Sequence, residues 1–227
     1  MIYAHSLTCR ESPESLAAGA ETTFVIAGLG KFGCLALERL QRSFPHSRII
    51  ALEQDGEKSA RKFSPPISII EGDAVSLLLE APLFHAEDLV IPMVPFNLAA
   101  SYVLAKHANS REIAIPKEMI DLLPNPMVVN ESNIVCSRAD FVCPDDCPEG
   151  ELCTVTGKPR EPLYDALGRL ELPGYNILVQ KSSQILPGVG GYRLGDLHRL
   201  AQVVDKGRFV IATSCKCHGV LTAITIL

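Results

Sequence analysis

The chain has 227 residues, 47% of them apolar, so it can bury a substantial core rather than remain disordered. Its net charge of −5 and isoelectric point near 5.7 argue against nucleic acid as a partner, because phosphate binding needs a clustered basic surface. No apolar stretch reaches the roughly 18–20 residues that span a bilayer, so we do not expect a membrane-embedded protein.

Residues 1–22 are predicted to form an extension outside the folded domains. Charged residues fall where a secretory signal peptide would need an unbroken apolar segment, namely Arg10, Glu11 and Glu14. We therefore expect a cytoplasmic protein. In that compartment thiols stay reduced, and clustered cysteines more often indicate metal or redox chemistry than structural disulfides.

A glycine turn follows the first predicted strand. Residues 23–28, TFVIAG, form the β-branched, apolar run that is typical of a buried parallel strand. Leu37, Leu40 and Phe44 then recur at helical spacing, and Pro45 ends the predicted helix. The intervening G-x-G-x-x-G consists of Gly28, Leu29, Gly30, Lys31, Phe32 and Gly33.

Strand, glycine turn and helix are the context that a dinucleotide-binding turn requires. Gly28 permits the tight turn, Gly30 lets the backbone approach a pyrophosphate, and Gly33 lets the helix pack against the strand. The helix N-terminus offers unpaired N–H groups to the phosphates. The alternative is a scaffold that keeps these glycines for packing alone.

An acidic residue follows the second predicted strand. Residues 48–52 form this strand, and Glu53 stands twenty residues after Gly33. A carboxylate at that place accepts hydrogen bonds from a ribose 2′-hydroxyl and repels a 2′-phosphate. The pattern therefore favours NAD(H) or an adenine nucleotide over NADP(H).

Further strands are predicted at residues 67–70, 88–94 and 112–115, with a helix at 97–108. Strands that alternate with helices indicate a parallel sheet with crossover connections. We therefore predict an α/β fold, in which a Rossmann-type parallel sheet over residues 23–128 precedes a smaller α+β region over residues 129–227.

Four segments resemble the TrkA-N domain, the nucleotide-binding half of potassium-uptake regulators and of the related RCK domains. They are GLGKFG, EQD, EGDA and HAEDLVI, within residues 23–115. The resemblance implies regulatory binding of NAD(H), ATP or ADP, pairing as a homodimer, and a potassium transporter as a possible partner. The residues that it implies for the nucleotide site are Gly28, Gly30, Gly33, Glu53, Gly72, Asp73 and Ala74.

The second half is rich in cysteine. Three thiols lie in one irregular stretch and two more in Cys-Lys-Cys-His near the C-terminus; they are Cys143, Cys147, Cys153, Cys215 and Cys217. Three thiols from the loop plus one from the distant segment would complete a tetrahedral zinc site or hold a [4Fe–4S] cluster. Zinc and iron–sulfur remain equally open. The alternative is free, redox-active thiols, or disulfides formed after oxidation.

Three other cysteines have different expectations. Cys34 is predicted to pack in the first helix, Cys136 to be a small core residue or a spare ligand, and Cys9 to have no particular role. If strand alternation continued through Cys-Lys-Cys-His, Cys215 and Cys217 would share one face and His218 would point away from Cys217.

A second glycine-rich stretch, residues 187–196, precedes a helix predicted at 197–204. It could present N–H groups and Arg193 to an anion. We favour the alternative of a long connection with Asp196 as the helix N-cap. Strands at 208–214 and 220–226 complete the predicted chain.

Together these features predict a nucleotide-binding protein of regulatory or redox-sensing type with a cysteine-ligated metal or redox site. One alternative is an NAD-dependent oxidoreductase that uses an iron–sulfur centre or a dithiol together with a redox partner. A second is a cytosolic regulatory subunit of a potassium transporter.

Overall fold

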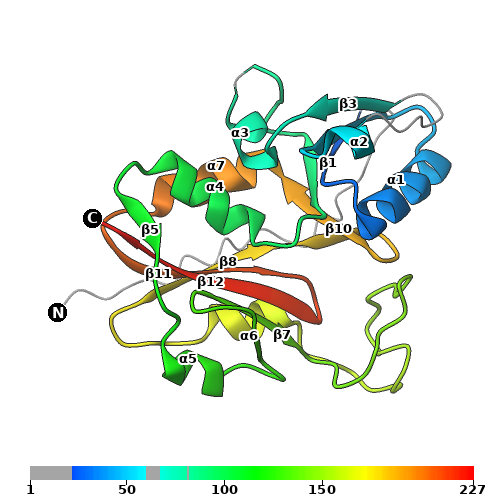
Figure 1. Cartoon of the computed structure of the whole chain (residues 1–227). Helices are drawn as coiled ribbons and strands as arrows, with labels where there is room; N and C mark the ends of the chain where they lie inside the picture. Colours follow the sequence, from blue (N-terminus) through cyan, green and yellow to red (C-terminus); the bar gives the residue numbers. More distant parts are fainter. Residues whose placement is uncertain (1–21, 60–66, 81) are drawn as a thin grey trace.

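The computed structural model describes residues 22–59, 67–80 and 82–227, which form a mixed α/β protein with two six-stranded mixed sheets (Figure 1). The predicted α/β class is therefore confirmed. The predicted extension lies outside the described residues except for residue 22, and Cys9 lies outside them as well.

The first sheet has the strand order β3-β2-β1-β4-β10-β9. Its first four strands are parallel, whereas β10 runs antiparallel to β4, and β9 antiparallel to β10. The buried central strands are the continuous apolar runs that the sequence shows. The strands are β1 (Thr23–Ala27), β2 (Arg48–Glu53), β3 (Ile67–Glu71), β4 (Leu89–Pro92), β9 (Ser183–Leu186) and β10 (Val189–Arg193).

The prediction of a purely parallel sheet with a fifth strand at residues 112–115 is wrong. The corresponding strand, β5 (Ser110–Glu112), pairs with β12 in the second sheet. Strand β10 takes the place beside β4, and Gly191 allows this close approach, because a Cβ there would stand 2.5 Å from the main-chain oxygen of Val90.

The second sheet has the order β6-β7-β12-β11-β8, with β5 also paired to β12. Strand β11 runs parallel to β8 and antiparallel to β12, so this sheet is mixed too. Its remaining strands are β6 (Met127–Val128), β7 (Asn133–Ser137), β8 (Asn176–Lys181), β11 (Gly207–Ser214) and β12 (His218–Ile226).

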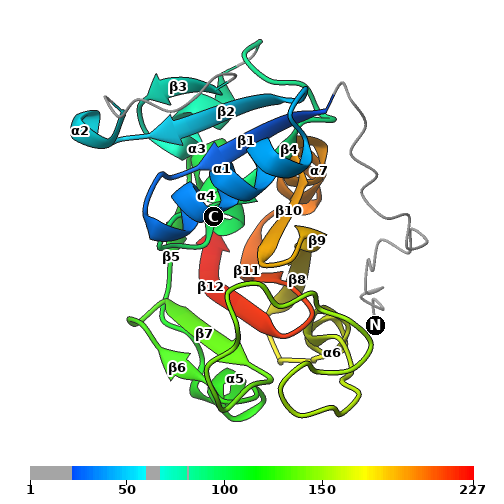
Figure 2. The ribbon, with the colours of Figure 1, turned by 90° about the vertical axis from the view of Figure 1, so that its right-hand side faces the viewer.

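Helices form layers on and between the sheets (Figure 2). Side chains of α3, α4 and α7 share one core with both sheets, so these helices lie between them. Helix α1 covers the other face of the first sheet, and α5 and α6 cover the other face of the second. The helices are α1 (Lys31–Ser43), α2 (Gly56–Ser59), α3 (Ala74–Leu79), α4 (Leu98–Lys106), α5 (Lys117–Asp121), α6 (Leu163–Gly168) and α7 (Leu194–Val203).

The second glycine-rich stretch is not an anion-binding loop. It forms the β9–β10 hairpin and leads directly into α7. Asp196 accepts a hydrogen bond from the Arg193 main-chain N–H at 2.9 Å and forms a capping box from the third helical position rather than the N-cap itself. The Arg193 guanidinium pairs with Glu87 at 2.6 Å instead of facing an open loop.

Candidate functional site

The glycine turn, residues 28–33, connects β1 to α1, and two of its glycines are required by the packing. Gly28 has φ 95°, and a Cβ there would stand 2.9 Å from the main-chain oxygen of Met93. A Cβ at Gly33 would stand 2.0 Å from the main-chain oxygen of Gly28. Gly30 differs, since no atom of the described residues lies within 4 Å of its Cβ position. Packing therefore explains Gly28 and Gly33 but not Gly30.

Glu53 ends β2 beside this turn and is 8% exposed. One carboxylate oxygen accepts the Leu29 main-chain N–H at 2.6 Å, and the other accepts the Asp55 N–H at 3.0 Å. The carboxylate therefore holds the glycine turn against the end of β2.

Gly72, Asp73 and Ala74 lie at the carboxyl end of β3, on the same edge of the sheet as the glycine turn. Gly72 has φ 153°, and Asp73 caps α3 by accepting the Ser76 N–H at 2.8 Å. Ala74 is buried in the core. Each residue has a structural role at the place where the sequence predicts a nucleotide contact.

A cavity of about 360 Å³ opens at the glycine turn. Two lysines, Lys31 and Lys58, bring positive charge to it, although Lys58 is paired with Asp55 at 3.2 Å and Glu38 also lines the cavity. The lining residues are Leu29, Gly30, Lys31, Cys34, Leu35, Glu38 and Lys58.

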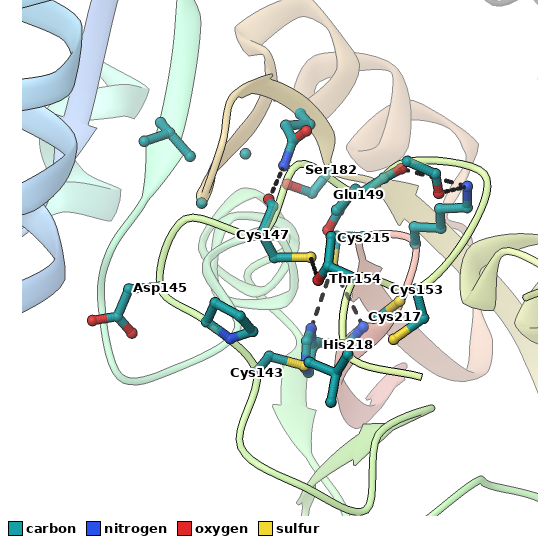
Figure 3. Close-up of a pocket in the computed structure, with 18 of the residues that line it drawn as sticks. Cys143, Asp145, Cys147, Glu149, Cys153, Thr154, Ser182, Cys215, Cys217 and His218 are labelled. Carbon is teal, nitrogen blue, oxygen red and sulfur yellow. Dashed lines mark hydrogen bonds between the residues drawn. The ribbon is translucent and has the colours of Figure 1, made fainter. Parts of the chain in front are cut away.

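A second cavity, of about 570 Å³, collects the cysteines and is called the cysteine cavity below (Figure 3). Its walls come from the cysteine loop (residues 138–162, between β7 and α6), the turn between β11 and β12, and the carboxyl end of β4. Phe32, in the first turn of α1, also lines it. The five cysteines singled out in the sequence all line this cavity together with His218: Cys143, Cys147, Cys153, Cys215 and Cys217.

The cysteine loop is held by three long side chains from three different elements. Arg39 of α1 donates to the main-chain oxygen of Asp145 at 2.8 Å, and Gln184 of β9 donates to that of Cys147 at 2.7 Å. Lys216, in the β11–β12 turn, donates to the main-chain oxygens of Glu149 and Gly150. The loop is therefore fixed to both sheets through its own carbonyl groups.

Cys215, His218 and Glu149 meet at one side of the cysteine cavity. The Cys215 Sγ lies 3.8 Å from His218 Nδ1 and accepts the His218 main-chain N–H at 3.4 Å. Burial, and next the Glu149 carboxylate, raise the pKa of Cys215 to about 12, and burial lowers the pKa of His218. Glu149 has φ 48°, a left-handed conformation that residues other than glycine rarely adopt. Both shifts favour the neutral forms of the thiol and the imidazole.

Two further thiols have polar partners of their own. The Arg160 guanidinium lies 3.9 Å from the Cys217 Sγ. Hydrogen bonds from the Thr156 side chain, and next from its main-chain N–H, lower the pKa of Cys153.

The remaining loop thiols are more weakly held. Cys147 Sγ lies 3.9 Å from Thr154 Oγ1. Burial, and next the neighbouring Cys147, raise the pKa of Cys143. Both thiols line the cysteine cavity.

The strand alternation expected through Cys-Lys-Cys-His does not occur, because residues 215–217 form the hairpin turn and only His218 begins β12. Consequently Cys215 pairs with His218. Sequence reasoning also missed Glu149 and Arg160. The Cys-x2-His spacing in the sequence could have indicated that Cys215 and His218 lie close together.

Cys34 and Cys136 lie outside the cysteine cavity. The Cys34 thiol donates to the main-chain oxygen of Leu29 at 3.4 Å within the glycine turn. Cys136 is buried in the core of the second sheet, and burial raises its pKa to about 11. Over residues 22–59, 67–80 and 82–227 no two cysteines form a disulfide with each other, and no three His, Cys, Asp or Glu side chains stand close enough to hold a metal ion as they lie.

A third cavity, of about 590 Å³, lies beside the cysteine cavity and shares Cys215 and His218 with it. Its other walls are largely apolar and include Val94, Phe96 and Met127. The Cys215–His218 pair therefore forms part of the wall between two cavities.

These features define an α/β protein in which a cysteine-lined cavity adjoins a glycine turn. Residues 89–227, more than half of the chain, match the AF_1314_C family model, described as "Uncharacterized protein, C-terminal domain". The chain belongs to this family. A protein of Archaeoglobus fulgidus, also described as "Uncharacterized protein", is 26% identical over 221 residues, which cover 88% of this chain and 98% of the relative. No solved structure matches the chain.

The comparisons overturn the resemblance to TrkA-N and RCK domains. The matched family is a different one. Its match begins at residue 89, after three of the four resembling segments have ended. The first sheet is moreover mixed, since β10 and β9 extend it in the antiparallel sense. Three of the four segments contain residues with local roles, because Gly28 and Gly33 are required by the turn, Glu53 holds it and Asp73 caps a helix. A role in potassium transport, which depended on this resemblance, loses its basis.

No helix in the described part of the chain combines the length and the apolar character that crossing a membrane requires.

Proposed function

We propose that the protein binds NAD(H) or an adenine nucleotide at the glycine turn and senses redox or metal state through the cysteine cavity. In this proposal β3-β2-β1-β4 is a Rossmann-type unit. Its strand order reverses between β1 and β4, and ligands of such sheets bind at the carboxyl ends of the strands at that point.

One observation carries the proposal: helix α1 borders both cavities. Lys31 lines the cavity at the glycine turn, and the next residue, Phe32, lines the cysteine cavity. Further along the same helix, Arg39 holds the cysteine loop at Asp145. A ligand that settles on the first turn of α1 would therefore act on the element that positions the cysteines.

Gly30 supports the nucleotide part of the proposal. An added Cβ at this position would meet nothing within 4 Å, so packing does not require a glycine there. A bare backbone at the start of a helix is what a pyrophosphate needs in order to approach the N–H groups. Glu53, beside the turn, would disfavour a 2′-phosphate.

The experiment is nucleotide binding by Gly30→Val, with titration calorimetry against NADH, NAD⁺, ADP, ATP and NADPH. The open space at Gly30 predicts a folded variant that binds at least about tenfold more weakly, because the side chain would occupy the phosphate position. Wild-type protein that binds none of the five would refute the nucleotide part. The sensing part predicts that bound nucleotide changes the alkylation rates of Cys143 and Cys147.

A second candidate function is an NAD-dependent oxidoreductase with a dithiol or an iron–sulfur centre. It is favoured by the place of the cysteine cavity, which Pro92 and Met93 line at the carboxyl end of β4. A nicotinamide ring held there would face the thiols. Anaerobically purified protein with a visible iron–sulfur band that NADH bleaches would favour this candidate.

A further inference from the structure

Cys215 and His218 are spaced like two ligands of one metal ion. Their Sγ and Nδ1 atoms lie 3.8 Å apart. In a tetrahedral zinc site, with Zn–S of about 2.3 Å and Zn–N of about 2.0–2.1 Å, sulfur and nitrogen stand about 3.6 Å apart. The hairpin turn between β11 and β12 thus holds the pair close to the geometry that a metal requires.

The cysteine loop offers a matching pair. Cys143 and Cys147 are separated by three residues, a spacing within the range that zinc knuckles use. Both line the same cavity as Cys215 and His218. The two thiols are also electrostatic neighbours, since Cys147 has a larger electrostatic effect on the pKa of Cys143 than Cys217, Arg160 or Cys153 has.

We propose that Cys143, Cys147, Cys215 and His218 form a Cys₃His site for a zinc-class divalent cation. This rests on the proposed function in that it specifies the metal and the ligands of the cysteine site. It does not depend on nucleotide binding.

The other two thiols act electrostatically on Cys143, and each also has a polar partner of its own. Cys217 faces the Arg160 guanidinium at 3.9 Å, and Cys153 is bonded by Thr156. A [4Fe–4S] cluster takes four thiolates, whereas the preformed pair contains an imidazole. The geometry therefore favours zinc over iron–sulfur.

The surroundings suit a mixed thiolate–imidazole site. Metal-bound histidine is commonly oriented by a carboxylate, and the Glu149 carboxylate lies near both His218 and Cys215. Three thiolates around a divalent cation carry a net charge of −1. Arg160 and Lys216 line the same cavity and supply the compensating positive charge.

Metal binding must also close the site, because no three candidate ligands in the described chain stand close enough together as they lie. The hairpin fixes the Cys215–His218 pair, and hydrogen bonds to the main-chain oxygens of Asp145 and Cys147 hold the loop backbone. The movement therefore falls to rotation of the Cys143 and Cys147 side chains. Binding should therefore slow amide hydrogen exchange in residues 143–153 and leave β11 and β12 unchanged.

The test uses the reduced full-length protein under anaerobic conditions, with Zn²⁺ affinity measured against a chromophoric chelator. Cys215→Ser, His218→Gln, Cys143→Ser and Cys147→Ser should each weaken binding about tenfold or more, since even outer-shell partners cost that much. The comparison variants Cys153→Ser, Cys217→Ser, Cys34→Ser and the exposed His46→Gln should stay within about twofold of wild type.

A second measurement needs no variant and so does not depend on whether each variant folds. The absorption spectrum of the Co²⁺-loaded wild-type protein should be that of tetrahedral cobalt with three thiolates and one nitrogen. A four-sulfur spectrum, or a loss of affinity in Cys217→Ser or Cys153→Ser but not in His218→Gln, would overturn the ligand set. An iron–sulfur chromophore, or no affinity for Zn²⁺ and Co²⁺, would overturn the site itself.

The outcome separates this inference from the proposed function. Protein that binds Zn²⁺ through these four ligands but no nucleotide would retain the metal site and refute only the nucleotide part. Protein that binds nucleotide and loses affinity in Gly30→Val, but takes up no Zn²⁺ or Co²⁺, would refute only the metal site.

Discussion

Arg39 Nη1 on helix α1 donates to the main-chain oxygen of Asp145 at 2.8 Å, across 106 residues of sequence. The same nitrogen donates to Pro187 in the β9–β10 turn at 2.9 Å. One guanidinium therefore joins the helix that follows the glycine turn, the cysteine loop and the hairpin that extends the first sheet. This contact is the most direct physical link between the two candidate sites.

Arg39→Gln should loosen the cysteine loop. Each hydrogen bond from a charged donor contributes about 1–3 kcal/mol, and partial exposure reduces this, so we expect a loss of about 1 kcal/mol in unfolding free energy. Hydrogen exchange of residues 143–153 should become faster. The matched control is Arg42→Gln, an exposed arginine in the last turn of the same helix. Equal exchange in both variants would show that Arg39 does not hold the loop.

Two glycines with left-handed backbone form a second matched pair. Gly188 has φ 71°, and a Cβ there would stand 1.8 Å from the main-chain oxygen of Asp145. Gly157 has φ 67°, but nothing lies within 4 Å of its Cβ position. Alanine at either position should cost about 1–2 kcal/mol in unfolding free energy through backbone strain. Only Gly188→Ala should also displace the cysteine loop, measured as faster alkylation of Cys147; equal alkylation in both variants would contradict this docking.

The thiols should react in a definite order in metal-free protein. Burial, followed by the Glu149 carboxylate, raises the pKa of Cys215 to about 12, and burial raises that of Cys136 to about 11. Hydrogen bonds from Thr156 lower the pKa of Cys153. Because the thiolate is the nucleophile, iodoacetamide at about pH 8 should modify Cys153 first and Cys215 and Cys136 last. Peptide mass spectrometry over time measures the order, and early labelling of Cys215 would contradict it.

The first half of the fold could be predicted because its strands carry their own signal. Strands buried on both faces are continuous apolar runs, such as Thr23–Ala27, and a glycine turn follows where the chain must bend sharply. Strand β10, which pairs with β4, lacks such a continuous apolar run. It pairs with β4 from about a hundred residues away, and its glycines resemble a loop although they permit close strand packing.

The candidate site was predictable in its residues but not in its arrangement. Clustered cysteines in the sequence were enough to select the five thiols that line one cavity. The sequence did not show which of these thiols pairs with His218, because this depends on where β11 ends. A strand through residues 215–217 would separate Cys215 from His218, whereas a turn brings them together. Arg39 carries no sequence signal at all, since its contacts lie 106 and 148 residues away.

Asn97 joins the N-terminus of α4 to the second sheet, and its replacement tests how that helix is held there. It is 2% exposed; its amide nitrogen donates to the main-chain oxygen of Ile211 at 2.9 Å, and its amide oxygen accepts the Thr213 hydroxyl at 2.8 Å. It also caps α4. Asn97→Ala should cost about 2–4 kcal/mol in unfolding free energy, from a lost cap and buried groups left unpaired.

Asn97→Asp should make that cost depend on pH. A carboxylate beside the Ile211 carbonyl is disfavoured, so the folded-state pKa of the new acid lies above its unfolded value of about 3.9. The folded state then binds the proton more tightly, and stability falls as pH rises from the unfolded pKa through the folded one. Urea unfolding should therefore find this variant weakest near neutral pH and closer to wild type near pH 4. Asn130→Asp is the matched control, because exposed Asn130 only accepts hydrogen bonds through its side-chain oxygen. A parallel pH profile for both variants would mean that the Asn97 amide does not donate to the second sheet.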